Sequence, residues 1–378
     1  MNSKKISLVF LTRKTVGGIK AHILDLVRSL DKEKYEISVL GPIDKDFINK
    51  LEASGTNFTY VEIADKLNPV KDIISVARIS RILKKLQPDI LHIHGNKSAL
   101  VGRWAARLAK VNRVIVTVHN FLTYQQKRGL LSELAFFEER RLAKSTSIIA
   151  AVSNQVKTNL VNKEGIDENK IAVVNNGFNV ENFEIIKNGT RKRYGISDGD
   201  FIALNIARMV EFKGQRYLIE ACQKILNEIP NFKLMILGSG PLETRLKKYA
   251  KKLGVEKCVI FISHVDDTNK LYSEADCFVL PSINEPFGIV LLEAMAHKLP
   301  IVAAKSGGVI DVLDEQSAVL VEPKSSVQIA KAVISLAKEK KISKRISSNA
   351  HDILQEQFTL NKMVNKTEKI YHQLMMSS

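Results

Sequence analysis

The feature that most constrains the fold is a regular alternation of short apolar runs with longer segments of helical apolar spacing. Short β-branched runs predict buried strands, whereas apolar residues at i, i+3, i+4 and i+7 predict helices. Strands that alternate with helices in this way predict parallel sheets built from βαβ units. The predicted strands are 6–11, 36–40, 90–94, 114–119, 147–152 and 171–174, and then 202–206, 233–237, 259–262, 277–280, 301–303 and 318–321.

The alternation is interrupted once, near Asn175-Asn176-Gly177, by a polar and turn-rich segment that extends to Asp200. Such a segment is typical of an interdomain linker. A chain of 378 residues also has the length of two domains. We therefore predict an α/β protein of two Rossmann-like domains, each with a doubly wound parallel sheet, and a cleft between them.

Composition excludes several other classes of protein. With 45% hydrophobic and 26% charged residues, the chain is neither disordered nor fibrous. Its apolar runs are far shorter than the roughly 18 residues of a membrane span, and the run 6–11 is too short for a secretory signal. The expected location is therefore the cytoplasm. Cys222, Cys258 and Cys277 lie inside apolar runs without CxxC spacing, which predicts buried thiols.

Charge is concentrated in the first half of the chain. Of the net charge of +17, residues 1–180 carry +12, from 29 Lys and Arg against 17 Asp and Glu. This excess favours an anionic partner: a nucleic acid, a membrane surface or a phosphorylated substrate. Arg103, Arg107 and Lys110 share one face of a predicted helix, and 127–128 and 140–141 are basic pairs, so an anionic membrane is one candidate and an ordinary solvated helix the other.

The most informative segment is 281–296, where a predicted strand ends, a loop turns the chain and a helix begins near Gly288. The first amides and the positive dipole end of such a helix favour phosphate or sugar oxygens. Glu285 precedes the helix and Glu293 lies two turns along it, with seven residues between them. The two carboxylates can therefore address one ligand at two places.

Two cations and two glycine loops follow other predicted strands. Arg208 and Lys213 come after strand 202–206, a position that suits a diphosphate because cations stabilise the charge that develops on a leaving group. Gly17-Gly18 and 238–240 also follow strands, and their backbones can approach a ligand closely. Neither loop has the complete GxGxxG pattern of dinucleotide-binding proteins.

Candidate metal ligands are few in the sequence. His119 closes strand 114–119, and His92 and His94 share one face of another strand, but the sequence shows no third ligand for that pair. The segments 44–46 and 198–200 imitate the DxD motif of metal-dependent transferases, yet both have the composition of turns. We therefore expect no metal.

Taken together, these motifs resemble those of the retaining family 4 glycosyltransferases, which have the GT-B architecture. Glu285 with Glu293 looks like the EX7E motif of that family, and the resemblance extends over nearly the whole chain. Ala207 and Asn175 depart from it, because the family commonly has glycine and proline there. The other matching positions are Gly17, Gly18, His119, Arg208, Lys213, Gly238, Ser239, Gly240, Gly307 and Gly308.

The resemblance implies a transferase that moves a sugar from a nucleotide diphosphate sugar with retention at the anomeric carbon. UDP is the expected nucleotide, although the residues do not identify the base. Glu293 would bind the ribose, Arg208 and Lys213 the diphosphate, and Glu285 with His119 the sugar. The implied catalytic residues are His119, Arg208, Lys213 and Glu285, and the implied donor-binding residues are Gly17, Gly18, Arg208, Lys213, Gly238, Phe287, Gly288, Ile289, Val290 and Glu293.

In domain terms, the resemblance implies an acceptor-binding domain over 1–182, a donor-binding domain over 183–355 and a helix over 356–378 that crosses back to the first domain. The expected acceptor is a saccharide, or a lipid-linked saccharide for cell-surface polysaccharide, used at the inner face of the cell membrane. Closing the cleft would exclude water. The alternatives are a nucleotide-sugar epimerase of the same architecture and a nucleic-acid-binding protein, the latter disfavoured by only 6% aromatic residues.

Overall fold

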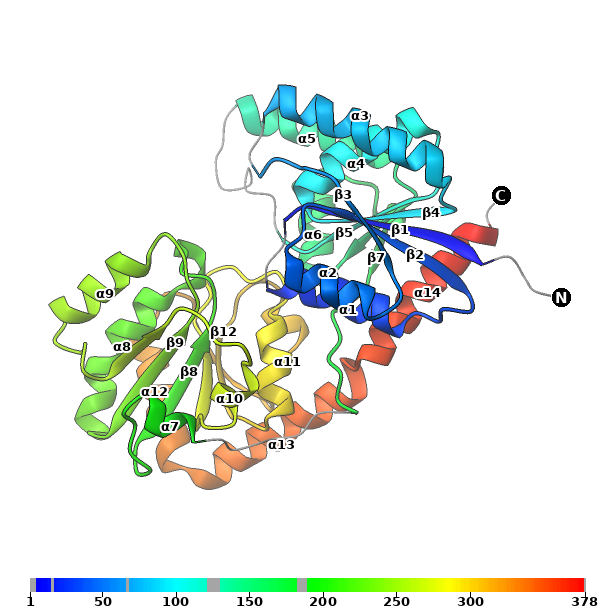
Figure 1. Cartoon of the computed structure of the whole chain (residues 1–378). Helices are drawn as coiled ribbons and strands as arrows, with labels where there is room; N and C mark the ends of the chain where they lie inside the picture. Colours follow the sequence, from blue (N-terminus) through cyan, green and yellow to red (C-terminus); the bar gives the residue numbers. More distant parts are fainter. Residues whose placement is uncertain (1–4, 15–16, 66–67, 121–129, 182–188, 377–378) are drawn as a thin grey trace. The chain divides into compact units, whose positions relative to one another are not determined.

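Figure 1 shows the computed structural model of the chain, which describes residues 5–14, 17–65, 68–120, 130–181 and 189–376. The chain forms two compact units. Unit 1 comprises Met1–Gly177 and Leu360–Ser378, and unit 2 comprises Phe178–Thr359. The boundaries drawn from the sequence lie after residues 182 and 355. None of the helices in the described parts of the chain is both long and apolar enough to cross a bilayer.

Unit 1 is built around a parallel sheet in which the described residues form seven strands. The strand order is β3-β2-β1-β4-β5-β6-β7. β1 lies between β2 and β4, so the chain winds first toward one edge of the sheet and then toward the other. Its strands are β1 (Ile6–Thr12), β2 (Tyr35–Gly41), β3 (Asn57–Tyr60), β4 (Ile90–His94), β5 (Val114–Val118), β6 (Ile148–Ala151) and β7 (Ile171–Val173).

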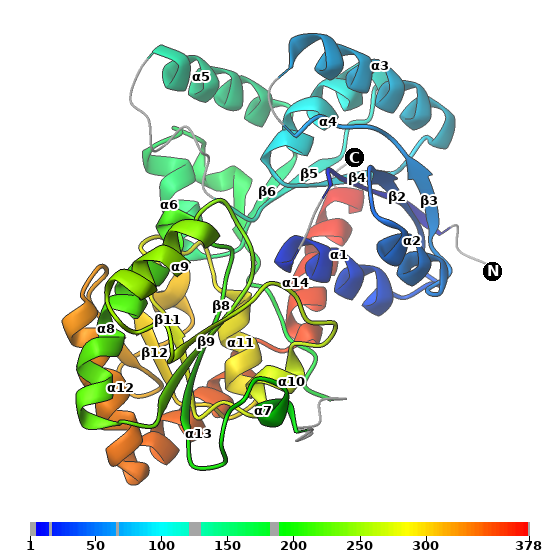
Figure 2. The same ribbon diagram turned by 60° about the vertical axis from the view of Figure 1, so that its left-hand side comes forward.

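Helices cover both faces of this sheet (Figures 1 and 2). α3, α4 and α5 pack together on one face, and α1, α2 and α14 on the other. Their apolar sides bury the strands, so β4 and β5 are buried at every residue, as expected for central strands of a parallel sheet. The helices are α1 (Gly18–Ser29), α2 (Lys45–Glu52), α3 (Pro69–Leu86), α4 (Asn96–Ala109), α5 (Leu130–Lys144), α6 (Asn154–Asn162), the 3₁₀ helix η2 (Glu168–Lys170) and α14 (Leu360–Met376).

The C-terminal helix α14 is an integral part of unit 1. The hydroxyl of its buried Tyr371 lies 2.7 Å from Nδ1 of His92 on β4. Arg113, just before β5, donates from Nε to the backbone oxygen of Leu374 at 2.7 Å. Apolar side chains of α14, among them Val364, join those of α1 and the strands in one core.

Unit 2 contains a second parallel sheet, of six strands among the described residues, in the order β10-β9-β8-β11-β12-β13. Here β8 and β11 are the neighbours at which the winding direction changes. Ligands of doubly wound sheets bind outside the carboxyl ends of such strands. The strands are β8 (Phe201–Ile206), β9 (Phe232–Leu237), β10 (Val259–Ile262), β11 (Cys277–Leu280), β12 (Ile301–Ala304) and β13 (Val319–Val321).

The helices of unit 2 also form two layers, with α8, α9 and α12 on one face and α11 with α13 on the other. Cys222, Cys258 and Cys277 are buried free thiols, as predicted. The helices are α7 (Thr190–Arg193), η3 (Glu211–Lys213), α8 (Gln215–Glu228), α9 (Glu243–Lys252), α10 (Asn269–Tyr272), α11 (Ile289–Ala296), η4 (Gly307–Asp311), α12 (Ser326–Lys338) and α13 (Lys340–Gln357).

The predicted fold class is confirmed, because both units are doubly wound parallel sheets covered by helices. The elements that the sequence prediction missed include helix α2 and strand β3. Strand β3 lies at the edge of its sheet and is mostly exposed, so it lacks the apolar run by which a buried strand is recognised. The helix expected over 356–378 corresponds to α14, and α12 and α13 precede it.

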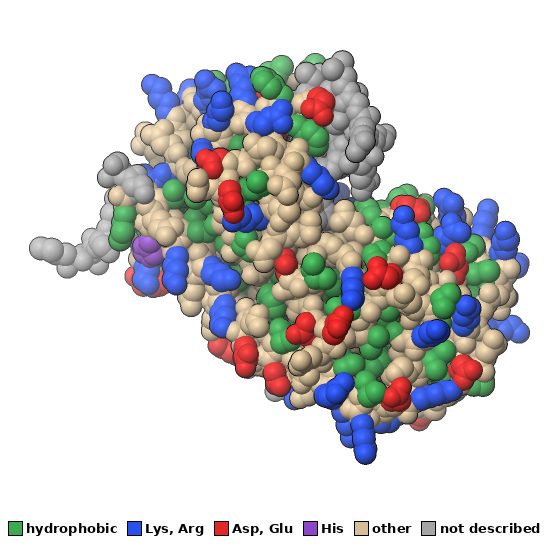
Figure 3. Space-filling model, turned by 180° about the vertical axis from the view of Figure 1, so that it is seen from behind, with side chains coloured by type: hydrophobic (Ala, Val, Ile, Leu, Met, Phe, Trp, Pro, Cys, Tyr) green, Lys and Arg blue, Asp and Glu red, His purple; other side chains and the backbone are tan. Residues whose placement is uncertain are grey.

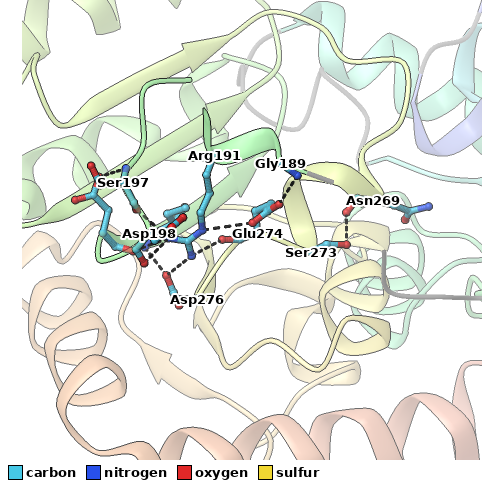
Figure 4. A network of polar contacts seen from close by, with 10 residues as sticks. Gly189, Arg191, Ser197, Asp198, Asn269, Ser273, Glu274 and Asp276 are labelled. Atoms are coloured by element: carbon cyan, nitrogen blue, oxygen red, sulfur yellow. Dashed lines mark hydrogen bonds and ion pairs between the residues drawn. The ribbon is translucent and has the colours of Figure 1, made fainter. Parts of the chain in front are cut away.

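A polar network stabilises the amino edge of the unit 2 sheet (Figure 4). Arg191 in α7 forms ion pairs with Glu274 and Asp276 at 3.4 and 3.3 Å, and it donates to the backbone oxygen of Asp200 at 2.9 Å. Asp276 also accepts from the backbone N–H of Ile202, the second residue of β8. The DxD-like segment 198–200 therefore lies at the amino end of β8 and serves a turn, as predicted.

Candidate functional site

A buried ion pair lies at the carboxyl edge of the unit 2 sheet. Lys213 Nζ, at the end of η3, is 2.6 Å from Glu285 Oε2, in the loop after β11. Ser282 donates its hydroxyl to the same carboxylate oxygen at 2.9 Å. The two side chains are only 18% and 6% exposed, so each charge depends on the other. The pairing joins two residues that the sequence analysis assigned to the site.

The backbone around Glu285 fits closely against Gly307. This glycine has φ +56°, and a Cβ atom at its position would lie 2.0 Å from the backbone oxygen of Glu285. The same oxygen accepts from the N–H of Gly308 at 2.7 Å. Ser306 donates its hydroxyl to the backbone oxygen of Ser282. The glycine pair thus fixes the loop that carries Glu285.

The loops after β8 and β9 are also in direct contact. A Cβ atom at Gly238 would lie 2.2 Å from the backbone oxygen of Ala207, so a side chain there would separate the loops. The N–H of Met209 donates to the backbone oxygen of Ser239 at 2.9 Å. Arg208, between these contacts, has an exposed side chain, and its backbone oxygen accepts from the side-chain amide of Gln215 at 3.0 Å. Its guanidinium is therefore accessible to a ligand.

Helix α11 begins at the same edge of the sheet. Gly288 occupies its N-cap position with φ +91°, and Ile289 and Val290, the first two helical residues, are partly exposed. Their amides have no acceptor within the helix. The ring of Phe287, by contrast, is buried and packs edge-on against Phe358 at 5.9 Å. Of the predicted residues in this segment, Phe287 could contribute only its backbone.

Glu293 lies one turn further into α11. The surrounding protein raises the pKa of its carboxyl group to about 7 by desolvation, which a hydrogen bond with Tyr272 partly offsets. Tyr272 also donates to the backbone oxygen of Val290 at 3.2 Å and stacks on His297 at 4.8 Å. A carboxylate in this environment gains from any ligand that brings hydroxyl donors to it.

This pKa predicts a pH-dependent stability. Because the pKa of Glu293 is near 7 in the folded chain and 4.5 when unfolded, the folded state binds more protons between these values, and stability falls as pH rises through them. We expect wild type and Glu293→Gln to be about equally stable at pH 5 and the variant to be more stable by about 2 to 3 kcal/mol at pH 8. Urea unfolding at both pH values measures this, and a variant advantage that does not change with pH would contradict it.

The unit 2 site therefore combines features suited to a phosphorylated, hydroxyl-rich ligand. Lys213 and Arg208 supply positive charge, and the start of α11 supplies amides and its dipole. Glu285 and Glu293 supply carboxylates, which accept hydrogen bonds from hydroxyl groups. All of these groups follow β8 or β11, the strands at which the winding of the sheet changes direction.

In unit 1 the structure places His119 directly after β5, beside two other histidines. Nδ1 of His94, at the end of β4, is 3.1 Å from His119 Nε2. His22 in α1 lies with its ring 4.8 Å from that of His119, and its Nδ1 is 2.9 Å from Asn176 Oδ1. Burial lowers the pKa of His22 to about 4 and lowers the pKa of His94 and of His119 well below the usual range. All three rings are neutral at pH 7.

This arrangement corrects one expectation from the sequence. The His92 and His94 pair was expected to have no third ligand nearby, but His94 meets His22 and His119 instead. His92 forms hydrogen bonds with Tyr371 and with Thr117, both at 2.7 Å. Parallel pairing of β4 with β5 brings these residues together, a contact that spacing along the chain does not reveal.

The remaining predicted residues of unit 1 lie at the starts of helices α1 and α2. Gly17 is the exposed N-cap of α1, and Gly18 is its first residue. Asp44 was expected in a turn but caps α2 by accepting from the N–H of Phe47 at 2.8 Å. Asp44 and Asp46 pair with Lys20 at 3.0 and 2.9 Å, so this DxD-like segment is neutralised by a lysine.

The prediction of a basic face on α4 is wrong for Arg103. That side chain is 1% exposed and forms an ion pair with Glu139 at 2.6 Å. Arg107 and Lys110 are exposed as expected, and Arg107 and Arg141 both lie over the ring of Trp104. Helical spacing placed Arg103 with the other two, but α5 covers that part of the helix. Residues 127–128 lie outside the described parts of the chain.

Two residues of the unit 2 site were missed by sequence reasoning. Ser282 lies three residues before Glu285, and this spacing within a turn-rich loop is the one signal that could have indicated it. Tyr272 comes from a helix of four residues 21 positions before Glu293, and no local pattern connects them. Only the tertiary structure shows that its hydroxyl is held at the start of α11.

Family models match the chain in two consecutive segments. Residues 16–182 match the model described as Glycosyltransferase Family 4, and residues 187–352 match the model described as Glycosyl transferases group 1. Together the two segments cover most of the chain and fall on the two units described above.

Curated relatives are similar over most of their length. The chain is 27% identical over 363 residues to the UDP-Gal:alpha-D-GlcNAc-diphosphoundecaprenol alpha-1,3-galactosyltransferase of Escherichia coli, covering 94% of each chain. It is 26% identical to the N-acetyl-alpha-D-glucosaminyl L-malate synthase of Bacillus anthracis, covering 81% of this chain and 80% of that protein. These relatives lend no support to the epimerase alternative.

Solved structures share the fold. Anabaena HepE in complex with UDP and glucose superposes with a TM-score of 0.84 at 21% identity, over 97% of this chain and 99% of that one. WaaG, a glycosyltransferase involved in lipopolysaccharide biosynthesis, gives a TM-score of 0.76 at 18% identity, over 96% and 99%. With both units matched by family models and with this architecture, the chain belongs to the family 4 glycosyltransferases and is a sugar-transferring enzyme.

Proposed function

We propose that this glycosyltransferase takes its sugar from a UDP-sugar, retains the configuration at the anomeric carbon and transfers the sugar to a lipid-linked saccharide in cell-surface polysaccharide synthesis. The observation that carries the proposal is the buried Lys213–Glu285 pair at the carboxyl edge of β8 and β11, flanked by Arg208 and the start of α11. The donor and acceptor named for the Escherichia coli relative support the chemical classes.

Each group at this edge has a role that its chemistry suits. Lys213 and Arg208 hold the diphosphate and stabilise the charge that it gains as the sugar leaves. Glu293 accepts from the ribose hydroxyls. Glu285, oriented by Lys213 and Ser282, accepts from the sugar hydroxyls together with the amides at the start of α11. His119 contacts the sugar from unit 1, and the glycine loop at Gly17 and Gly18 faces the acceptor or a phosphate.

We also propose that transfer requires no metal ion. Two cations and a helix N-terminus supply the positive field that a metal supplies in other transferases. Neither DxD-like segment is available for this task, since one is paired with Lys20 and the other serves a turn at the opposite edge of the sheet.

A donor screen tests the proposal. The purified chain is incubated with UDP-sugars, and with ADP- and GDP-sugars as controls, in the presence of an undecaprenyl-diphosphate-linked saccharide and with or without EDTA. We expect transfer from a UDP-sugar, an α-linked product from an α-linked donor, and the same rate with EDTA. Transfer from another nucleotide sugar, an inverted product, or loss of activity with EDTA that Mg²⁺ or Mn²⁺ restores would each refute the corresponding part of the proposal.

We place the enzyme in the cytoplasm, where unit 1 contacts the inner, anionic face of the cell membrane. Helix α3 exposes apolar side chains in its first turns, with Val70 and Ile73 each 69% and Ile74 45% exposed. An apolar strip continued by cations is typical of a helix that lies on a lipid surface. Lys and Arg side chains gather along the top of Figure 3, where the helices of unit 1 lie. The exposed cations later in α3 are Arg78, Arg81, Lys84 and Lys85.

Vesicle co-sedimentation tests this contact. We expect wild type to sediment with vesicles containing phosphatidylglycerol but not with pure phosphatidylcholine, and high salt to release it, because each cation near the surface contributes about 1 kcal/mol. Ile73→Glu and the pair Arg78→Glu with Arg81→Glu should each weaken binding at least about tenfold. Val327→Glu, which changes an exposed apolar residue of unit 2, is the control. Binding that none of the α3 variants reduces would exclude this surface.

A further inference from the structure

Three buried histidines of unit 1 form a cluster whose ring nitrogens converge. One nitrogen each from His22, His94 and His119 lies within 4.8 Å of the other two. The residues come from α1, the end of β4 and the segment after β5, and they are 3%, 0% and 8% exposed. Within the described parts of the chain, no other group of three His, Cys, Asp or Glu side chains has this arrangement.

The hydrogen bond of His22 leaves one of its nitrogens ready to act as a ligand. Its Nδ1 lies 2.9 Å from Oδ1 of Asn176. Because an amide oxygen only accepts, Nδ1 carries the hydrogen and Nε2 keeps its lone pair. A histidine that donates its other N–H to an oxygen is the usual form of a metal ligand, since that bond fixes both the tautomer and the ring orientation.

His94 carries the second observation, an unsatisfied polar atom. Its Nε2 is completely enclosed and has no hydrogen-bond partner among the described residues. Its Nδ1 faces His119 Nε2 at 3.1 Å. Two neutral rings share one hydrogen in that contact, and Nε2 of His94 is in addition a buried nitrogen without a partner, which is unfavourable. A cation bound between the two facing nitrogens would use the lone pair of each, once the shared hydrogen has moved to the outer nitrogen of its ring.

We propose that His22, His94 and His119 form a binding site for a divalent transition-metal ion such as Zn²⁺. Three imidazoles without a carboxylate suit Zn²⁺, Co²⁺, Ni²⁺ or Cu²⁺ and do not suit Mg²⁺ or Ca²⁺. With Zn–N bonds of about 2.0–2.1 Å, ligand nitrogens lie roughly 3.3 Å apart in a tetrahedral site. The 3.1 Å pair already meets this distance, and the remaining separations, at most 4.8 Å, require side-chain rotation when the ion binds.

The proton balance of binding is simple. If His94 and His119 both ligate through the nitrogens that now face each other, the hydrogen between them moves to the other nitrogen of the ring that carries it. All three rings stay neutral, so binding releases no net proton. A water molecule completes the fourth position, as in zinc sites with three protein ligands.

An ion in this site inhibits transfer, and this consequence rests on the proposed function of His119. A ring nitrogen that ligates a metal, in a ring whose orientation the metal fixes, no longer adjusts to the donor sugar. We therefore expect micromolar Zn²⁺ to lower the transfer rate and EDTA to restore it. The binding of the ion itself does not depend on that role.

Cobalt titration tests the site directly. The full chain is treated with EDTA, desalted and titrated with Co²⁺, whose visible absorption reports tetrahedral coordination, and Zn²⁺ is then added as a competitor. We expect one equivalent to bind, and His22→Gln and His94→Gln to raise the Kd at least about tenfold. The control is the double variant His264→Ala with His372→Ala, which removes two exposed histidines and should leave the Kd within about twofold.

A second measurement uses wild type, because a substituted buried histidine can impair folding. A crystal grown with Zn²⁺ should show an anomalous difference peak among the three rings. The proposed site would be overturned if this peak were absent. It would also be overturned if Co²⁺ binding were weakened by the double variant of the exposed histidines and not by His22→Gln or His94→Gln. Failure of every donor in the transfer assay would refute the proposed function alone, since titration and crystal require no turnover.

Discussion

Replacing Lys213 by alanine is expected to lower kcat/KM by about 10²- to 10³-fold, the loss typical of removing one group that stabilises developing charge. The variant loses the cation proposed to hold the diphosphate, and it leaves Glu285, which is only 6% exposed, without its ionic partner. Because charge on the leaving group is largest in the transition state, we expect kcat to fall more than KM rises. Steady-state kinetics with the preferred donor measures both.

The control for this variant is Lys338→Ala. Lys338 also forms an ion pair with a glutamate of unit 2, Glu228, but both side chains are about half exposed, so its loss should leave kcat/KM unchanged. The double variant Lys213→Ala with Glu285→Gln distinguishes two causes. If Lys213 acts through its pairing with Glu285, the double variant is no worse than the worse single one. If Lys213→Ala had the same kcat and KM as wild type, the assignment of Lys213 to the donor site would be wrong.

Gly307→Ala is expected to destabilise unit 2 by about 3 kcal/mol or more and to abolish activity. Two effects add: φ +56° is unfavourable for alanine, and the new Cβ atom would lie 2.0 Å from the backbone oxygen of Glu285. Relief of the clash must move the loop that carries Glu285. For a unit of this size the change corresponds to a Tm lower by about 6 to 12 °C, which calorimetry measures.

Gly195→Ala is the matched control. Gly195 also lies in unit 2 with positive φ, at +65°, but a Cβ atom there would meet nothing within 4 Å. Its substitution should therefore cost only the backbone strain, about 1 kcal/mol, and leave kcat/KM intact. Equal destabilisation by the two substitutions would show that the close approach to Glu285 has no energetic consequence.

The fold could be predicted because its signals are local. The alternation of apolar runs located all of the described strands except β3, in the correct order along the chain, and parallel sheets follow from that alternation. The exceptions have a physical cause. β3 is an exposed edge strand without an apolar run. Asp44 is the N-cap of α2, and a short polar side chain at such a position is also typical of a turn, which is what the sequence predicted there.

Parts of the site could be predicted for a related reason. Loops after parallel strands emerge at one edge of a sheet, so Arg208, Lys213, Glu285 and Glu293 were expected near one another before any contact was known. What the sequence could not supply is which atoms meet. The pairing of Lys213 with Glu285 joins positions 72 residues apart and depends on β8 lying next to β11.

By itself, then, the sequence determined the fold class, the two-part organisation, the buried thiols and the family motifs. Each of these can be recognised from hydrophobic periodicity or from short spacings along the chain. Tertiary structure alone decided that Arg103 is buried against Glu139, that Tyr272 meets the start of α11 and that His22, His94 and His119 converge. The physical reason is common to all three. Burial and side-chain contact depend on the order in which strands pair and on the helices that cover them, which no spacing within one element encodes.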